Sequence, residues 1–100
     1  MTDKTLTLLG FASKAGKLSY GMDMMLEAVK TKKAKLVLAA ADLSAKTLKE
    51  IDFYTNKHKA ECINLDCDMG TLSHAIGRKC GVISVNDNGF AEAIGDTLTK

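Results

Sequence analysis

The chain has 100 residues and a mass of 10.7 kDa, which is the length of one domain. Hydrophobic residues make up 46% and charged residues 26%, which excludes a disordered chain, and no apolar run approaches the roughly 20 residues of a membrane span. The net charge is only +2, but residues 1–35 alone carry seven lysines against three acids, which predicts one basic face.

The first third of the chain reads as two helices. Residues 3–15 place apolar side chains on one helical face, and Gly16 follows where a helix can end. Residues 17–20 are long enough only for a turn or a stub of strand. Gly21 begins a second helix with an apolar stripe at the spacing i, i+3, i+4, i+7. This stripe consists of Met22, Met25, Leu26 and Val29.

The middle of the chain reads as strand, helix, strand. Residues 36–41 are a continuous apolar run, which predicts a central strand covered on both faces. Ser44 is placed to cap a helix that runs to about residue 59, and Leu43 and Leu48 stand where a hydrophobic staple would put them. Residues 62–65 then predict a third short strand.

The last third repeats the alternation. Asp68 caps a helix that Gly77 ends, residues 82–85 predict a strand, and residues 86–89 a turn and cap before a last helix. Strands that alternate with helices of about ten residues indicate an α/β fold. We therefore expect residues 1–100 to form a single domain, a three-layer α/β/α sandwich with a small mixed, mostly parallel four-stranded sheet.

Nucleotide hydrolysis is disfavoured by the glycine spacing. A phosphate-binding loop of the Walker type needs four residues before its Gly-Lys-Ser/Thr end. Five residues separate Gly10 from Gly16, and Leu18 replaces the hydroxyl residue that would hold magnesium.

Metal binding and catalysis are disfavoured by the placement of the reactive side chains. The histidines and two of the cysteines have intervals that match no common zinc pattern. These residues are His58, Cys62, Cys67 and His74. Asp23 and Glu27 lie one turn apart, which fits a solvated helix face better than acid–base chemistry. We expect no enzyme activity, no metal, no cofactor and no small-molecule substrate, and the odd number of cysteines predicts reduced thiols in a cytoplasmic protein.

The basic turn before the second helix is a candidate anion site. Lys14 and Lys17 precede the free N–H groups that begin at Gly21, an arrangement suited to phosphate oxygens. The competing interpretation is a solvated surface rich in lysine.

Six short stretches carry a family resemblance, in an order and spacing that persist over essentially the whole chain. They are LGFA at residues 9–12, AGKL at 15–18, residues 21–29, KAKLVLAAAD at 33–42, AIGR at 75–78 and VISV at 82–85. In these stretches the sequence resembles the kink-turn-binding large-subunit ribosomal protein family (the L-seven-Ae and L-thirty-e type), especially its short bacterial members.

The resemblance implies a three-layer α/β/α fold that binds structured RNA, often a sharply bent internal loop. In that family the RNA is held by the start of the second helix and by the loop before the last strand. The corresponding residues here are Gly21, Met22, Asp23, Met24 and Glu27, then Arg78, Lys79, Cys80, Gly81 and Val82. Many relatives carry an Asn-Glu pair and a following lysine on that helix, and here those positions are Asp23, Met24 and Glu27.

These observations predict a non-catalytic, ribosomal-type RNA-binding protein whose partner is ribosomal or ribosome-associated RNA. Its expected phosphate contacts are Lys14, Lys17, Lys30, Lys32, Lys33, Arg78 and Lys79. The alternative is a protein-interaction module that keeps the fold without the RNA. The RNA hypothesis requires that two stretches distant in sequence, near Gly21 and near Lys79, meet on one basic surface.

Overall fold

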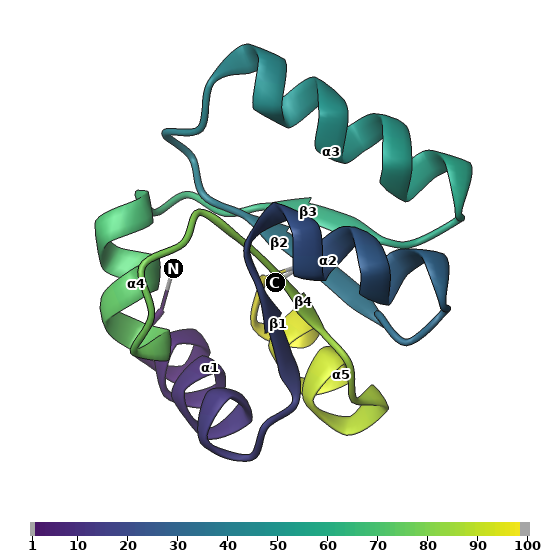
Figure 1. Ribbon diagram of the computed structural model, residues 1–100. Helices are drawn as coiled ribbons and strands as arrows, with labels where there is room; N and C mark the ends of the chain where they lie inside the picture. Colours follow the sequence, from purple (N-terminus) through teal and green to yellow (C-terminus); the bar gives the residue numbers. More distant parts are fainter. Residues whose placement is uncertain (1, 99–100) are drawn as a thin grey trace.

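The computed structural model describes residues 2–98, which form five helices and four strands (Figure 1). In chain order these are α1 (Asp3–Lys14), β1 (Leu18–Tyr20), α2 (Gly21–Lys30), β2 (Leu36–Ala39), α3 (Ala45–Lys57), β3 (Cys62–Asn64), α4 (Met69–Ile76), β4 (Val82–Val85) and α5 (Asn88–Leu98). Among these helices none has the length and apolar character to cross a membrane.

The helix ends follow local chemistry that the sequence made visible. The Ser44 hydroxyl accepts the Thr47 N–H at 3.1 Å, and the Asp68 carboxylate accepts the Thr71 N–H at 2.7 Å, so both are the expected N-caps. Gly77 ends α4 with a φ of +77°, a left-handed conformation that favours glycine. The predicted turn at residues 86–89 is shorter than expected, because the Asp87 carboxylate already caps α5 by accepting the Phe90 N–H at 2.9 Å.

The sheet is mixed and four-stranded, as expected, with the order β1-β4-β2-β3. The expectation of a mostly parallel sheet is wrong: β2 and β3 are parallel, but β4 is antiparallel to both β1 and β2. Ala39, at the end of β2, lies beside both Asn64, at the end of β3, and Val82, at the start of β4. The intervening α4 therefore returns the chain to the end of the sheet that it left, whereas a parallel crossover needs the opposite end.

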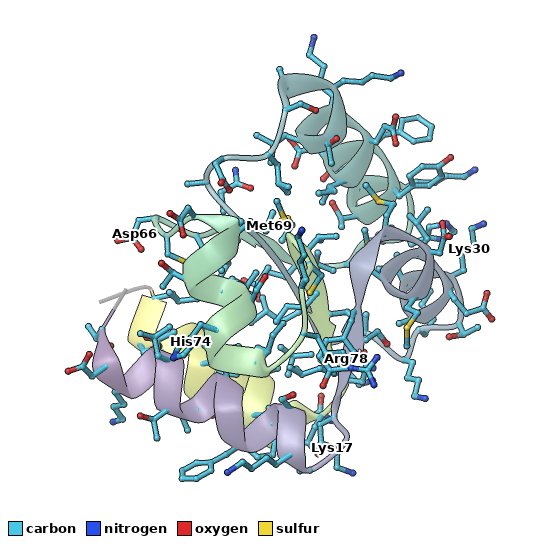
Figure 2. The ribbon with its side chains drawn as sticks, turned by 60° about the vertical axis from the view of Figure 1, so that its left-hand side comes forward. Lys17, Lys30, Asp66, Met69, His74 and Arg78 are labelled. Carbon is cyan, nitrogen blue, oxygen red and sulfur yellow. The ribbon has the colours of Figure 1, made fainter. Side chains whose placement is uncertain are left out.

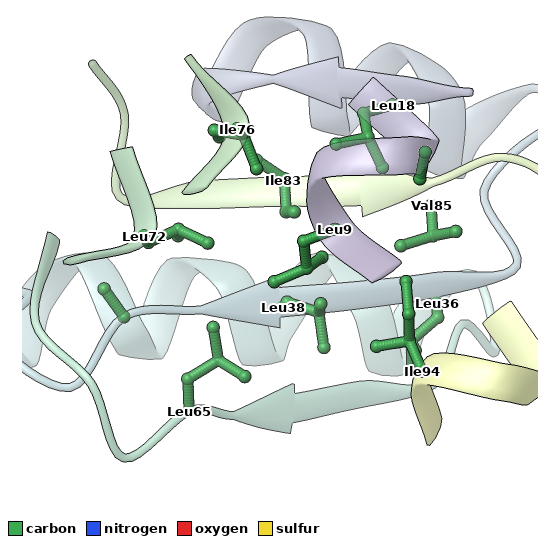
Figure 3. Close-up of a cluster of buried hydrophobic side chains, with 12 residues drawn as sticks. Leu9, Leu18, Leu36, Leu38, Leu65, Leu72, Ile76, Ile83, Val85 and Ile94 are labelled. Carbon is green, nitrogen blue, oxygen red and sulfur yellow. The ribbon is translucent and has the colours of Figure 1, made fainter. Parts of the chain in front are cut away.

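The two faces of the sheet carry two separate cores, which makes the molecule three-layered. Strand residues alternate, so that Leu36 and Leu38 face one side and Val37 and Ala39 the other. The first side packs against α1, α4 and α5, and Figure 3 shows that cluster around Leu9, Leu38 and Ile83. The second packs against α2 and α3. The expected α/β/α sandwich is confirmed (Figure 1).

A polar contact holds the short edge strand β1 on the sheet. The Ser84 hydroxyl, fully buried in β4, donates to Asn86 Oδ1 at 2.8 Å, and Asn86 Nδ2 donates to the Ser19 hydroxyl in β1 at 2.8 Å. The Asn86 N–H also donates to the Lys17 carbonyl oxygen at 2.8 Å. Three residues of strand would pair weakly alone, so these bonds fix where α2 begins.

Candidate nucleic-acid interface

The loop between α4 and β4 lies against the start of α2. The guanidinium carbon of the exposed Arg78 is 4.5 Å from the centroid of the Tyr20 ring, and Tyr20 directly precedes Gly21. A cation over the face of an aromatic ring is attracted by the ring quadrupole. The stretches near Gly21 and near Lys79, which the RNA hypothesis requires to meet, are therefore in contact.

Hydrogen bonds fix Tyr20 beneath Arg78. The Ser13 hydroxyl donates to the Ile76 carbonyl oxygen at 2.7 Å and lies 2.6 Å from the Tyr20 hydroxyl. Because a serine has one hydroxyl proton, Tyr20 is the donor in the second bond. The end of α1, the end of β1 and the end of α4 are thereby joined at one point, directly behind the candidate surface.

Cys80, in the loop between α4 and β4, contacts both α4 and the start of α2. Its backbone N–H donates to the Ser73 hydroxyl at 3.1 Å, and that hydroxyl donates back to the Cys80 carbonyl oxygen at 3.2 Å, which fastens the loop to α4. Burial raises the pKa of the Cys80 thiol, while a hydrogen bond from the Gly21 backbone N–H lowers it. The thiol therefore stays protonated near neutral pH and acts as a structural contact.

The first turn of α2 leaves backbone donors available. Gly21 has a φ of +83°, which a residue with a side chain would adopt only under strain, and Tyr20 provides no side-chain cap. The Gly21 N–H is taken by the Cys80 thiol, which places the positive end of the α2 dipole beside the loop that carries Arg78 and Lys79. The N–H groups of the next residues of this turn have no partner within the helix.

The remaining predicted residues divide by position. Asp23, Met24 and Glu27 are exposed on α2 and border a groove of about 420 Å³ along the β1 edge. Met22 is half-buried and packs on the core between α2 and the sheet, and Gly81 is half-buried in the loop. Val82 is only 4% exposed, so any contact it makes with a ligand comes from its backbone.

The basic residues do not form a single cluster. Lys79 lies exposed beside Arg78, and Lys14 follows the serine that binds Tyr20. Lys17 precedes β1, about 10 Å from Tyr20 at the rise of a strand. Lys30 ends α2, about 14 Å from Gly21 at the rise of a helix, and Figure 2 shows it apart from Lys17 and Arg78.

Tyr20 and Ser13 are the residues that sequence reasoning missed. The available signal was the position of Tyr20 immediately before the glycine that begins a helix, but no local pattern reveals that an arginine 58 positions later packs on its ring. Within residues 2–98 no three His, Cys, Asp or Glu side chains are grouped so that they could hold a metal ion.

Comparison with known proteins identifies the family of the chain. Residues 3–94 match the model of the ribosomal protein L7Ae/L30e/S12e/Gadd45 family. The chain belongs to this family. Two relatives, from Enterococcus faecium and Bacillus subtilis, are each called RNA-binding protein YlxQ and are each 32% identical to this member. The first alignment covers 89% of this chain and 85% of the relative, and the second covers 87% of both.

Two solved structures share the fold of this chain. A protein of unknown function from Bacillus halodurans superposes with a TM-score of 0.92 at 26% identity, covering 99% of this chain and all of the other. A 15.5 kDa RNA-binding protein from Giardia lamblia superposes with a TM-score of 0.75 at 17% identity, covering 93% of this chain and 80% of the other. The second likeness establishes the shared fold alone.

Proposed function

We propose that the protein is a non-catalytic RNA-binding protein of the cytoplasm that recognises structured, kink-turn-like RNA, either ribosomal or ribosome-associated. The observation that carries the proposal is the contact of Arg78 with Tyr20, since it joins the loop before β4 to the start of α2 in one exposed basic surface. The names of the two relatives support RNA as the ligand.

Phosphate groups would bind at the start of α2. Arg78 has five N–H donors, and stacking on the ring face of Tyr20 uses none of them. The first-turn N–H groups of α2 and the side chain of Lys79 supply further donors. Lys14, the last residue of α1, and Lys17, which precedes β1, are both exposed and would extend this surface.

Bases rather than a duplex groove would give specificity. The major groove of A-form RNA is too deep and narrow for side chains, whereas a sharp bend exposes unstacked bases. Asp23 can accept hydrogen bonds from a guanine N1–H or N2–H₂ or from a cytosine amino group, and Met24, 49% exposed, offers an apolar contact to a base face. Glu27 would repel phosphate, so the RNA backbone would cross the helix near Gly21 rather than follow it.

Charge reversal tests the proposal. Wild-type protein should bind a kink-turn RNA more tightly than a straight duplex of equal length, with a log–log salt slope of about −3 for three or four phosphate contacts. Arg78→Glu should weaken binding at least tenfold, and Lys17→Glu less. Lys4→Glu, at the opposite end of α1 from Lys14, is the matched control. Equal binding by Arg78→Glu and Lys4→Glu would refute the placement of the site.

One feature favours the alternative of a protein-interaction module. Met24 is exposed between Asp23 and Glu27, and an apolar side chain flanked by carboxylates suits a basic protein surface better than a phosphate backbone. Recovery of a protein partner after nuclease treatment, from protein that retained no RNA beforehand, would establish that alternative.

A further inference from the structure

A second exposed aromatic side chain lies on α3, away from the start of α2. Phe53 is 60% exposed, and among the described residues no large hydrophobic side chain is more exposed. The Tyr54 ring meets it edge-on, with centroids 5.1 Å apart and planes at 85°. Lys57 places its Nζ 6.0 Å from the centroid of the Phe53 ring. We call Phe53, Tyr54 and Lys57 the α3 aromatic surface.

Packing of α3 does not account for Phe53. The helix is held by Ile51 and Thr55, which are buried toward α2 and the sheet. Phe53 lies two residues from each, which at 100° per residue puts it on the far side of the helix. The half-buried Tyr54 contacts the Phe53 ring, yet Phe53 keeps 60% of its surface exposed to solvent.

The charge around this surface is mainly positive. A hollow of about 620 Å³ is lined by Phe53, Tyr54, Lys46, Lys49 and Glu50. Asp52 is a second exposed acid beside Phe53 in the sequence, so the three lysines Lys46, Lys49 and Lys57 outnumber two acids here. An open aromatic ring among lysines is the combination that proteins use to bind single-stranded nucleic acid.

Lys32, in the turn after α2, contacts the C-terminal end of α3. Lys32 Nζ donates to the His58 carbonyl oxygen at 2.6 Å, which ties that turn to the end of α3. The pKa of His58 is lowered by burial and then by the charges of Lys32, Lys57 and Lys30. Lys30, which Figure 2 shows apart from Arg78, therefore lies close enough to the end of α3 for its charge to act on His58.

We propose that the α3 aromatic surface is a second RNA contact, at which an unpaired base of the bound RNA stacks on Phe53 while Lys57 and Lys49 meet its flanking phosphates. The inference rests on the proposed function and deepens it: the ligand would be a structured RNA with a single-stranded segment beside the bend. Every base has an aromatic face, so this contact adds affinity without sequence preference.

The test uses the full chain and two RNAs, a kink-turn RNA and the same RNA with a single-stranded extension of roughly ten nucleotides. Phe53→Ala should weaken binding of the extended RNA by between about fivefold and a hundredfold, which is the range for loss of one stacked base. Binding of the unextended RNA should stay within about twofold of wild type. Phe53→Trp, unlike Phe53→Ala, should bind the extended RNA as tightly as wild type, because a larger ring stacks equally well.

Phe11→Ala is the matched control, because Phe11 is 56% exposed on α1, in the opposite helix layer. Normal binding of the extended RNA by Phe53→Ala, with loss only in Arg78→Glu, would overturn this inference and leave the proposed function standing. So would a Phe53-dependent protein partner with no effect of Phe53→Ala on RNA affinity. If the wild-type protein binds neither RNA, both proposals fail.

Discussion

Substitution of Tyr20 separates the two roles that this residue has in the candidate interface. Its hydroxyl donates to Ser13 at 2.6 Å, and its ring lies 4.5 Å beneath the guanidinium carbon of Arg78. Tyr20→Phe removes only the hydroxyl. Tyr20→Leu removes the hydroxyl and the ring but keeps an apolar side chain, so the pair of variants isolates the contribution of the ring.

The expected magnitudes follow from these contacts. Loss of one partly buried hydrogen bond costs about 1 kcal/mol, which lowers the melting temperature by roughly 4–8 °C in a domain of this size. Loss of the cation–π contact costs about 0.5–1 kcal/mol more. If that energy orients Arg78 for binding, its loss weakens RNA affinity by about two- to fivefold.

Thermal unfolding and RNA titration of the same three proteins provide the measurements. Tyr20→Phe should be less stable than wild type but should bind RNA equally well, whereas Tyr20→Leu should lose both stability and affinity. Equal RNA affinities of Tyr20→Leu and Tyr20→Phe would contradict a role of the ring in binding, since Arg78 would then need no ring beneath it.

Three further substitutions test the packing and the protonation states. Leu9→Ala should lower the free energy of unfolding by about 3 kcal/mol in urea, because Leu9 is 0% exposed between α1 and the sheet; a loss below about 1 kcal/mol would contradict that packing. Gly81→Ala should cost about 1 kcal/mol, because its Cβ would come within 2.5 Å of Leu43 Cδ2, and unchanged stability would show that Leu43 moves freely. The pKa of Cys62 is raised from 9.0 to about 11 by burial and by Asp52, so the folded state holds its proton more tightly and stability should fall as pH rises from 9.0 toward 11. Cys62→Ala should flatten that fall in urea unfolding, and an equally steep fall in the variant would assign it to other groups.

The sequence predicted those parts of the fold that depend on neighbouring residues. The caps at Ser44 and Asp68 and the left-handed Gly77 are decided within one helical turn, and all three stand where expected. The direction of β4 was not predictable in this way. It depends on which end of the sheet α4 returns to, and periodicity carries no information about that.

In the candidate site, too, the sequence predicted some residues, while others depend on contacts between segments that are distant in sequence. The family resemblance led to Arg78 and Gly21, which the fold brings together, but it did not reveal the ring of Tyr20 between them. A charge count groups Lys30 with Lys17, because both belong to the basic first third of the chain. The rise along α2 separates Lys30 from Arg78, which a charge count along the sequence could not show.

NMR mapping of backbone amide shifts, while kink-turn RNA is added to the full chain, shows whether the start of α2 and the loop before β4 bind RNA as one surface. We expect the largest changes to fall together on residues 21–24 and 78–80, two segments that meet at Tyr20. Changes confined to α1 and α5, or to only one of the two segments, would contradict a single surface built from both.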